Sequence, residues 1–198
     1  MQTSEHLEQS AAMLNWVADV FYHPPSTEKL KLTKEIIEQW PNIAGDPSNE
    51  ISAIITSIET DQLEVINHDF HCLFIGPGKK LVYPWGSVYT DQEGLLFGNS
   101  TQFWESFCQH NEISITPNSN EPTDHFGLMF SALSAIMSSE NTEEVKLKQI
   151  STLLKDHFSP WGEKVLNDIH SHSKTNYYIS FSILASHIIN HWKNKLAL

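Results

Sequence analysis

The stretch EPTDHFG, at residues 121–127, places an acid and an imidazole side by side just before an apolar run. Glu121 is followed by Pro122, which suits a first helical turn, and then by Asp124 and His125. Carboxylates and imidazoles transfer protons, bind metals, cap helices or receive positively charged ligands. The stretch therefore predicts a helix start whose acid–imidazole pair has one of these four roles.

The catalytic role has little support in the sequence. Neighbouring helical residues point about 100° apart, so Asp124 cannot orient His125 as a triad carboxylate orients its histidine. The chain has no GxSxG stretch, and neither Cys72 nor Cys108 lies in a recognisable catalytic pattern. A metal-assisted hydrolase that uses Glu121, Asp124 and His125 remains the enzymatic alternative.

Two histidine pairs also have helical spacing, His68 with His71 and His187 with His191. Each pair offers two ligands on one helix face, whereas a structural zinc site takes four. Such pairs arise readily by chance in a chain with 11 histidines. The sequence thus predicts no metal and no other cofactor.

The third role of the pair is structural. An acid in the first turn of a helix stabilises it by about 0.3–1 kcal/mol. On this interpretation Asp124 is an exposed first-turn acid that contributes little to folding, and His125 is a partly buried, hydrogen-bonded ring.

A second stretch, VYPWGSVYTD at residues 82–91, gathers aromatic side chains between glycine and proline. Tyr83, Trp85 and Tyr89 lie close together in sequence, and Asp91 follows them. Rings of this kind form a shaped surface with polar edges, and beside acids they suit a guanidinium group. The alternative is that Trp85 pins the loop to the core. Trp104 and Trp161 lie in amphipathic helices and are expected in the core.

The elements that position these stretches are predicted to be helices. Three-and-four spacing of apolar residues, with turn residues between the segments, indicates eight or nine of them. The expected helices start near residues 4, 27, 49, 62, 99, 122, 142, 160 and 175. The aperiodic stretch at about 76–98 is expected to be a functional loop. The prediction is an all-α bundle forming one domain over residues 1–198, with a soft division near residues 76–120.

Charge is unevenly distributed along the chain. The net charge is −12, and all 12 basic residues are lysine. No lysine occurs from Leu81 to Val145, a span that holds nine acids. Nucleic acid is a poor partner for such a chain, because phosphates require basic residues to neutralise them. The acidic span predicts attraction of cations or basic peptides, although acidic surfaces also serve solubility alone.

Compartment and membrane association follow from other features. The first residues contain no basic segment followed by an apolar one, so no secretory signal is expected. The most apolar tract, residues 177–192, is broken by serine and histidine and is too polar to span a bilayer. Two distant cysteines fit a reducing compartment. The expectation is a cytoplasmic protein without membrane insertion.

The combination of stretches resembles one known family. YPWGSVYTDQEGLLFGNST, then NEPTDHFGLMF about 20 residues later, then FSPW at residues 158–161, is similar to the twin-arginine leader-binding chaperones of the DmsD/TorD type. These chaperones mature molybdenum oxidoreductases. The PWGSVY and LFGNST forms resemble the dimethyl-sulfoxide-reductase branch most.

The resemblance implies a helical chaperone of TorD-like fold and no enzymatic activity. It would bind the twin-arginine signal peptide of a molybdoenzyme precursor, a dimethyl-sulfoxide-reductase-type catalytic subunit, and delay its export until folding and cofactor insertion. The twin-arginine translocase is a further expected partner. A chaperone that grips the mature apoenzyme instead of its leader remains open, as does the choice between a monomer and a helix-swapped dimer.

The resemblance also implies a set of peptide-binding residues. Asp124 would accept a leader arginine or backbone amides, with His125 as its neighbour, and the aromatic loop would hold the apolar segment after the arginines. The full set is Leu73, Phe74, Trp85, Gly86, Ser87, Tyr89, Asp91, Gly98, Glu121, Pro122, Asp124, His125, Phe126 and Trp161.

Overall fold

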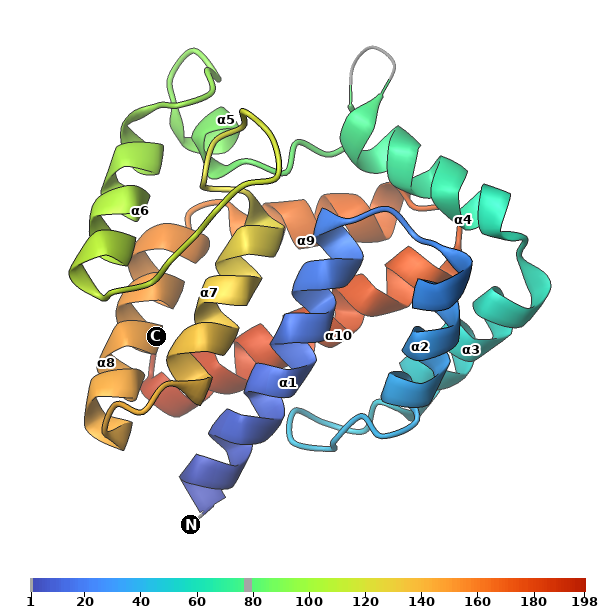
Figure 1. The fold of residues 1–198 in the computed structure, drawn as a ribbon, viewed down its shortest axis with the longest axis horizontal. Coiled ribbons are helices and arrows are strands. Elements are labelled where there is room, and N and C mark those ends of the chain that lie inside the picture. The colour runs from blue at the N-terminus through green and yellow to red at the C-terminus, as the bar shows by residue number, and fades with distance from the viewer. Residues whose placement is uncertain (1, 77–79) are drawn as a thin grey trace. The chain divides into compact units, whose positions relative to one another are not determined.

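The computed structural model describes residues 2–76 and 80–198, and over these residues the fold is all-α (Figure 1). The described part holds ten α-helices and two π-helical turns, with no strand. The helices are α1 (Gln2–Tyr22), α2 (Thr27–Ile37), α3 (Ser48–Thr60), α4 (Leu63–Phe70), α5 (Gly86–Thr90), α6 (Asn99–His110), α7 (Phe126–Ser138), α8 (Glu143–Thr152), α9 (Gly162–His172) and α10 (Asn176–Leu196). The π turns are η1 (His71–Ile75) and η2 (Leu153–Phe158).

The helical bundle predicted from sequence is confirmed, with one more helix than the eight or nine expected. The addition is α5, five residues within the stretch at 76–98 that was expected to be a loop. Five residues complete little more than one turn, so no apolar period can reveal such a helix. Residues 77–79 of that stretch lie outside the described part of the chain.

The chain divides into two compact units. The first contains residues 1–22, 84–163 and 192–198, and the second contains residues 23–83 and 164–191. The boundaries therefore fall inside α9 and α10 as well as between helices. The single domain expected from sequence stays a prediction.

The first unit is built on α1 and α7, which lie side by side (Figure 1). Phe21 of α1 packs on Phe126 and Phe130 of α7, with ring centroids 5.0 and 6.3 Å apart. The hydroxyl of Ser134 donates to the Ala11 carbonyl at 2.7 Å, which satisfies a buried polar group between the two helices. Phe130 also contacts Phe158 of η2, so this core joins the π turn to the central pair of helices.

The second unit has its own aromatic core. Phe70 and Phe74 contact each other at 5.2 Å, and both contact Tyr178 of α10. The carboxylate of Asp69, which is buried, accepts from the Thr175 backbone N–H at 2.9 Å and from the Thr175 hydroxyl at 2.7 Å. Asp69 thereby satisfies free donors at the start of α10.

None of the described helices combines the length and apolar character that crossing a bilayer requires.

Candidate functional site

Two stretches that are far apart in sequence are joined in the first unit by a short backbone bridge. Trp85 and His125 form an isolated antiparallel β-bridge. The Gly86 N–H donates to the Asp124 carbonyl at 3.1 Å, and the Phe126 N–H donates to the Pro84 carbonyl at 2.8 Å. The PWGSVY and EPTDHFG stretches are therefore one structural element, made by main-chain atoms.

Asp124 is buried in this element, with only 1% of its surface exposed. Its Oδ2 accepts from the Ser87 backbone N–H at 2.5 Å, at the start of α5. Burial raises the pKa of Asp124, while the donors of Ser87 and the hydroxyl of Thr101 act in the opposite direction. The expectation of an exposed acid in the first turn of α7 is wrong. The chain before α7 is used for the bridge, so the helix begins two residues after Asp124.

Three buried polar atoms at this point lack a well-formed hydrogen bond within the described protein. They are Oδ1 of Asp124 and the hydroxyl oxygens of Ser87 and Thr101. Buried polar groups are nearly always satisfied in folded proteins. The hydroxyls of Ser87 and Thr101 act on the Asp124 carboxylate, so the three atoms form one buried polar cluster, and a ligand with hydrogen-bond donors would complete its hydrogen bonding.

His125 is the N-cap of α7 and also a packing residue. Its Nδ1 accepts from the Gly127 N–H at 3.0 Å, so the proton of the neutral ring lies on Nε2. The ring meets Tyr22 edge-on at 4.9 Å and Trp85 at 5.9 Å. Imidazole at this position thus stabilises the helix start and holds the aromatic loop.

Glu121 connects the same rings from the other side. It accepts from the Tyr22 hydroxyl at 2.8 Å and from the Trp85 indole N–H at 3.3 Å. Burial, partly opposed by the Asn118 backbone N–H and reinforced by Glu121, raises the pKa of Tyr22 to about 12. Pro122, next in the chain, is buried. Glu121 and His125 thus share Tyr22 and Trp85 as partners, whereas the Asp124 carboxylate is bound by Ser87.

No group of three or more His, Cys, Asp or Glu side chains in the described ranges is arranged to hold a metal ion. The metal-assisted hydrolase considered from sequence therefore has no ligand set in this part of the chain.

Gly86 permits the closest contact in the site. A Cβ atom there would lie 2.5 Å from the Trp161 ring, so only glycine lets that indole cover the start of α5. Trp161 also stacks on Tyr89, with centroids 6.0 Å apart and planes 16° from parallel. Its indole N–H donates to the His157 carbonyl at 2.7 Å. Trp161 is buried, as expected of a core residue, and one part of it faces a cavity.

Asp91 shapes the turn between α5 and α6. Its Oδ1 accepts from the backbone N–H groups of Glu93 and Leu95, at 2.9 and 3.2 Å. A Cβ on Gly98, the residue before α6, would lie 3.2 Å from Asp91 Oδ2. Asp91 and Gly98 therefore fix the path of this exposed turn.

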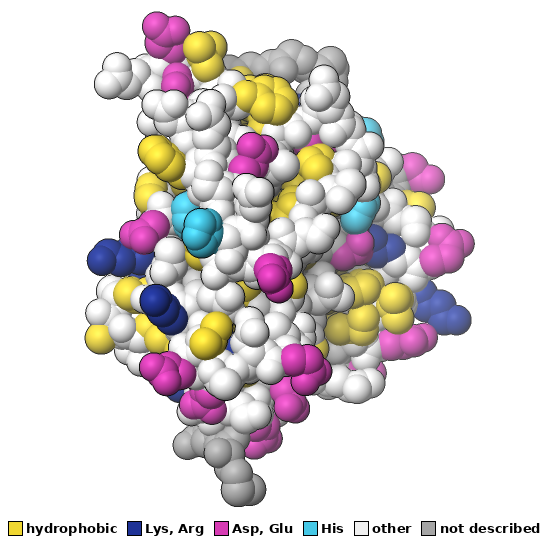
Figure 2. All heavy atoms as spheres, turned by 60° about the vertical axis from the view of Figure 1, so that its left-hand side comes forward, with side chains coloured by type: hydrophobic (Ala, Val, Ile, Leu, Met, Phe, Trp, Pro, Cys, Tyr) yellow, Lys and Arg dark blue, Asp and Glu magenta, His cyan; other side chains and the backbone are white. Residues whose placement is uncertain are grey.

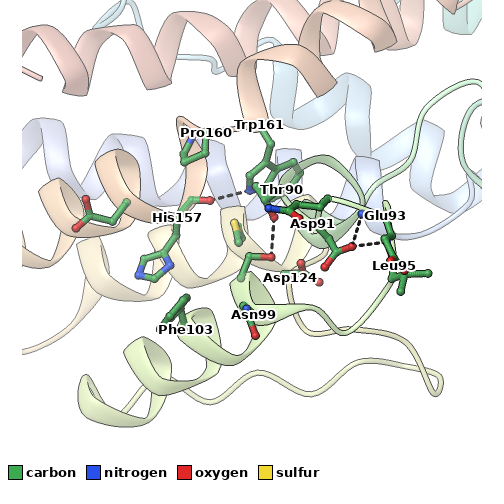
Figure 3. A pocket seen from close by; sticks show the side chains of 14 residues that line it. Thr90, Asp91, Glu93, Leu95, Asn99, Phe103, Asp124, His157, Pro160 and Trp161 are labelled. Carbon is green, nitrogen blue, oxygen red and sulfur yellow. Dashed lines mark hydrogen bonds between the residues drawn. The ribbon is translucent and has the colours of Figure 1, made fainter.

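These residues border a cavity of about 670 Å³ in the first unit (Figure 3). The figure shows Asp91, Glu93 and Leu95 on one side and Phe103, His157 and Pro160 on the other, with Trp161 between the two groups. Four carboxylates and no lysine line it among the described residues. The lining residues are Thr90, Asp91, Gln92, Glu93, Leu95, Asn99, Ser100, Phe103, Asp124, Met129, Asp156, His157, Pro160 and Trp161.

The sequence-based set of site residues is only partly brought together by this cavity. Asp91, Asp124 and Trp161 line it. Most of the other first-unit residues in the set do not line the cavity but contact the lining residues or one another, as described above. Leu73 and Phe74 belong to the second unit, where both side chains are buried. Their expected role in peptide binding stays a prediction.

Several cavity residues were missed by sequence reasoning. Asp156 and His157 come from η2, Glu93 from the α5–α6 turn, and Phe103 from α6. Phe103 is 68% exposed although it is a large apolar residue. The one available signal was the FSPW stretch directly after His157, which was identified only for its tryptophan.

The molecular surface carries the charge that the sequence predicts. On the face turned forward in Figure 2, Asp and Glu side chains are more numerous than lysine side chains, and apolar side chains are scattered among them. The exposed apolar residues near the cavity are Leu95, Leu96, Phe97 and Phe103. Acidic and apolar groups together match a ligand that is both basic and apolar.

Comparisons with known proteins agree with the helical fold. The family model for the nitrate reductase delta subunit matches residues 39–167. A putative redox enzyme maturation protein from Archaeoglobus fulgidus has a similar structure, with a TM-score of 0.61 at 14% identity, covering 89% of this chain and 93% of that one.

Curated relatives match over most of the chain. The Tat proofreading chaperone DmsD of Salmonella typhimurium is 30% identical, over 90% of this chain and 85% of the relative. The probable Tat proofreading chaperone DmsD of Haemophilus influenzae is 28% identical, over 94% and 91%. The chaperone protein TorD of Aliivibrio salmonicida is 28% identical, over 72% and 71%. The chain therefore belongs to the nitrate reductase delta subunit family and, within it, to the chaperones of the DmsD/TorD type, which are not enzymes.

Proposed function

We propose that this protein is a cytoplasmic chaperone that binds the twin-arginine signal peptide of a molybdenum oxidoreductase precursor. The client that the sequence favours is a catalytic subunit of the dimethyl-sulfoxide-reductase type, and binding delays its export until it has folded and received its cofactor. The twin-arginine translocase is the partner to which the released client passes. The names of the DmsD relatives support a role in Tat proofreading.

The observation that carries this proposal is the cavity between α5, α6 and η2. Four carboxylates and no lysine line it among the described residues, and its aromatic walls include Trp161 and Phe103. Arginine suits such a site better than lysine does, because its planar guanidinium stacks on aromatic rings and offers five N–H donors. The exposed apolar residues beside the cavity suit the apolar segment that follows the two arginines.

Asp124 gives the proposed site a preorganised acceptor. The bridge and the Ser87 N–H hold its carboxylate in place, and its Oδ1 has no well-formed hydrogen bond within the described residues. A charge-assisted hydrogen bond from a guanidinium would satisfy that oxygen and compensate the buried negative charge.

The test is a calorimetric titration of the full chain with two synthetic peptides. One carries two consecutive arginines before an apolar segment, and the other has lysines in their place. We expect tighter, salt-sensitive binding of the arginine peptide. If neither peptide binds and a leaderless client does, the chaperone grips the mature enzyme and the proposal is wrong.

A further inference from the structure

The cavity wall contributed by η2 is an irregular piece of helix. The Ser159 N–H donates to the Leu154 carbonyl at 2.8 Å, a bond between residues five apart where a regular α-helix joins residues four apart. Such turns are rare and occur frequently at functional sites. The turn therefore marks residues 153–158 as a segment whose helix has been widened locally.

The widened turn places three of its six side chains in the core and two at the cavity, while Lys155 is exposed and does not line the cavity. Leu153, Leu154 and Phe158 are at most 1% exposed. Asp156 and His157, which lie between them in sequence, line the cavity. A turn with an extra residue can keep the three apolar residues in the core and still direct the polar pair outward.

His157 does not compensate the charge of its neighbour. Its ring packs against the stacked pair of Trp104 and Phe107 in α6, with ring centroids 5.5 and 4.8 Å away. Burial lowers the pKa of His157, an effect that outweighs the opposite influence of Asp156. At neutral pH the ring is therefore uncharged, and it serves as part of an aromatic wall.

Asp156 is consequently a free carboxylate at the cavity. The described residues give it no hydrogen bond and no ion pair, and the same holds for Glu93 in the α5–α6 turn. A second feature of the cavity independently indicates a ligand, because Asp124 is almost fully buried at its border with Oδ1 unsatisfied. Together these groups suit a ligand that carries several N–H donors and a positive charge.

We propose that Asp156, presented by the π turn η2, is a specificity-determining residue that receives a guanidinium group of the client's leader. This inference rests on the proposed leader binding. The planar fork of a guanidinium can donate two parallel hydrogen bonds to the single carboxylate of Asp156, whereas an ammonium group is a single point charge. Phe103 and the His157 ring border the same space and provide flat surfaces for the guanidinium plane.

The experiment compares Asp156→Asn with wild-type protein in titrations of the twin-arginine and twin-lysine peptides. Glu140→Gln is the charge-matched control, because it removes one exposed negative charge from the turn after α7, away from the cavity. Thermal unfolding of all three proteins reports any effect on folding. We expect Asp156→Asn to weaken arginine-peptide binding about tenfold and lysine-peptide binding less than threefold, without a change in Tm. Glu140→Gln should leave the preference for arginine as it is.

Two results would overturn the inference while leaving the proposed function in place. One is wild-type affinity of Asp156→Asn for the arginine peptide. The other is an equal loss for both peptides, which would show that Asp156 contributes only long-range charge. Failure of the wild-type protein to prefer the arginine peptide would overturn both the inference and the leader-binding proposal.

Discussion

Asp124 supports the fold at the place where we propose that the leader binds. Its carbonyl and carboxylate oxygens accept from the Gly86 and Ser87 N–H groups, so the first turn of α5 depends on it. The resemblance to the family predicted that Asp124 binds the leader, and this stays a prediction. The burial of Asp124 was not predictable, because no local pattern shows that the chain before α7 pairs with the chain before α5.

Replacing Asp124 separates these two contributions. Asp124→Ala leaves the buried Ser87 N–H without its acceptor and should lower the free energy of unfolding by about 1–3 kcal/mol. Asp124→Asn retains an acceptor oxygen and should lower it much less, while both variants weaken arginine-peptide binding. Urea denaturation measures the stabilities. Equal stability of Asp124→Ala and wild type would show that the Ser87 contact does not support the fold.

The buried charge of Asp124 also predicts a pH dependence. Burial raises the pKa of Asp124 from its ordinary value of 3.8. A carboxyl whose pKa is higher in the folded chain binds its proton more tightly there, so its contribution to stability is present in acid and is lost as the pH rises from 3.8 through the raised pKa.

Asp124→Asn lacks this titration. Relative to wild type, its free energy of unfolding should therefore increase as the pH rises through that window. Denaturation at a series of pH values checks the difference between the two proteins. A difference that does not change with pH would contradict a raised pKa.

Phe103 offers a simpler test at the residue scale. It is 68% exposed, so Phe103→Ala should change the free energy of unfolding by no more than about 0.5 kcal/mol. Binding of the arginine peptide should nevertheless weaken several-fold, because an aromatic wall of the cavity is lost. Val145→Ala is the control, since Val145 is 43% exposed in the same unit and does not line the cavity. Equal binding by both variants and wild type would exclude Phe103 from the site.

At the scale of elements, α5 and the turn before α9 are held together by the contact of Trp161 with Gly86. A methyl group at position 86 would meet the indole at 2.5 Å. Gly86→Ala should therefore cost about 1–3 kcal/mol of stability. In a Trp161→Ala background the same change should cost much less, because the clashing ring is absent. A double-mutant cycle measured by urea denaturation gives this coupling. Additive effects would show that the two residues do not meet.

The long helices were predictable from sequence, and the short and irregular segments were not. Apolar residues that recur every three or four positions predicted α1 and α10 correctly, because in both helices this pattern continues for about 20 residues. The start of α7 was placed too early, because Pro122 satisfies the local rules for a helix start while the tertiary bridge delays the helix to Phe126. The π turns were not predicted. Their hydrogen bonds join residues five apart instead of four, but the pattern of polar and apolar residues over so short a segment still resembles that of an α-helix.

The proposed site residues were likewise predictable only where they lie in a recognisable sequence motif. PWGSVY and EPTDHFG were expected to act together, and their bridge confirms that they meet. Asp156 and Glu93 could not be found in this way. An isolated acid in a helix or an exposed turn has no signature of its own, and only the folded chain places both at one cavity.

At the scale of the whole molecule, net charge determines how fast a basic ligand arrives. With a net charge of −12, the protein should attract a cationic leader over distances that salt shortens. We expect the association rate of the arginine peptide to fall roughly tenfold between low and high salt in stopped-flow experiments. Trp85→Ala, which removes an uncharged ring, should retain that salt dependence. An association rate that is independent of salt would show that charge does not guide the encounter.

The bridge between residues 85 and 125 has a consequence for how this family can diversify. Its hydrogen bonds use only backbone atoms, so most side chains around it can be exchanged without breaking the joint. Gly86 and Asp124 are exceptions, because Trp161 covers the glycine and the Asp124 carboxylate accepts from the Ser87 N–H. Side chains of the cavity wall can therefore change one at a time during evolution while the backbone bridge that positions them is retained.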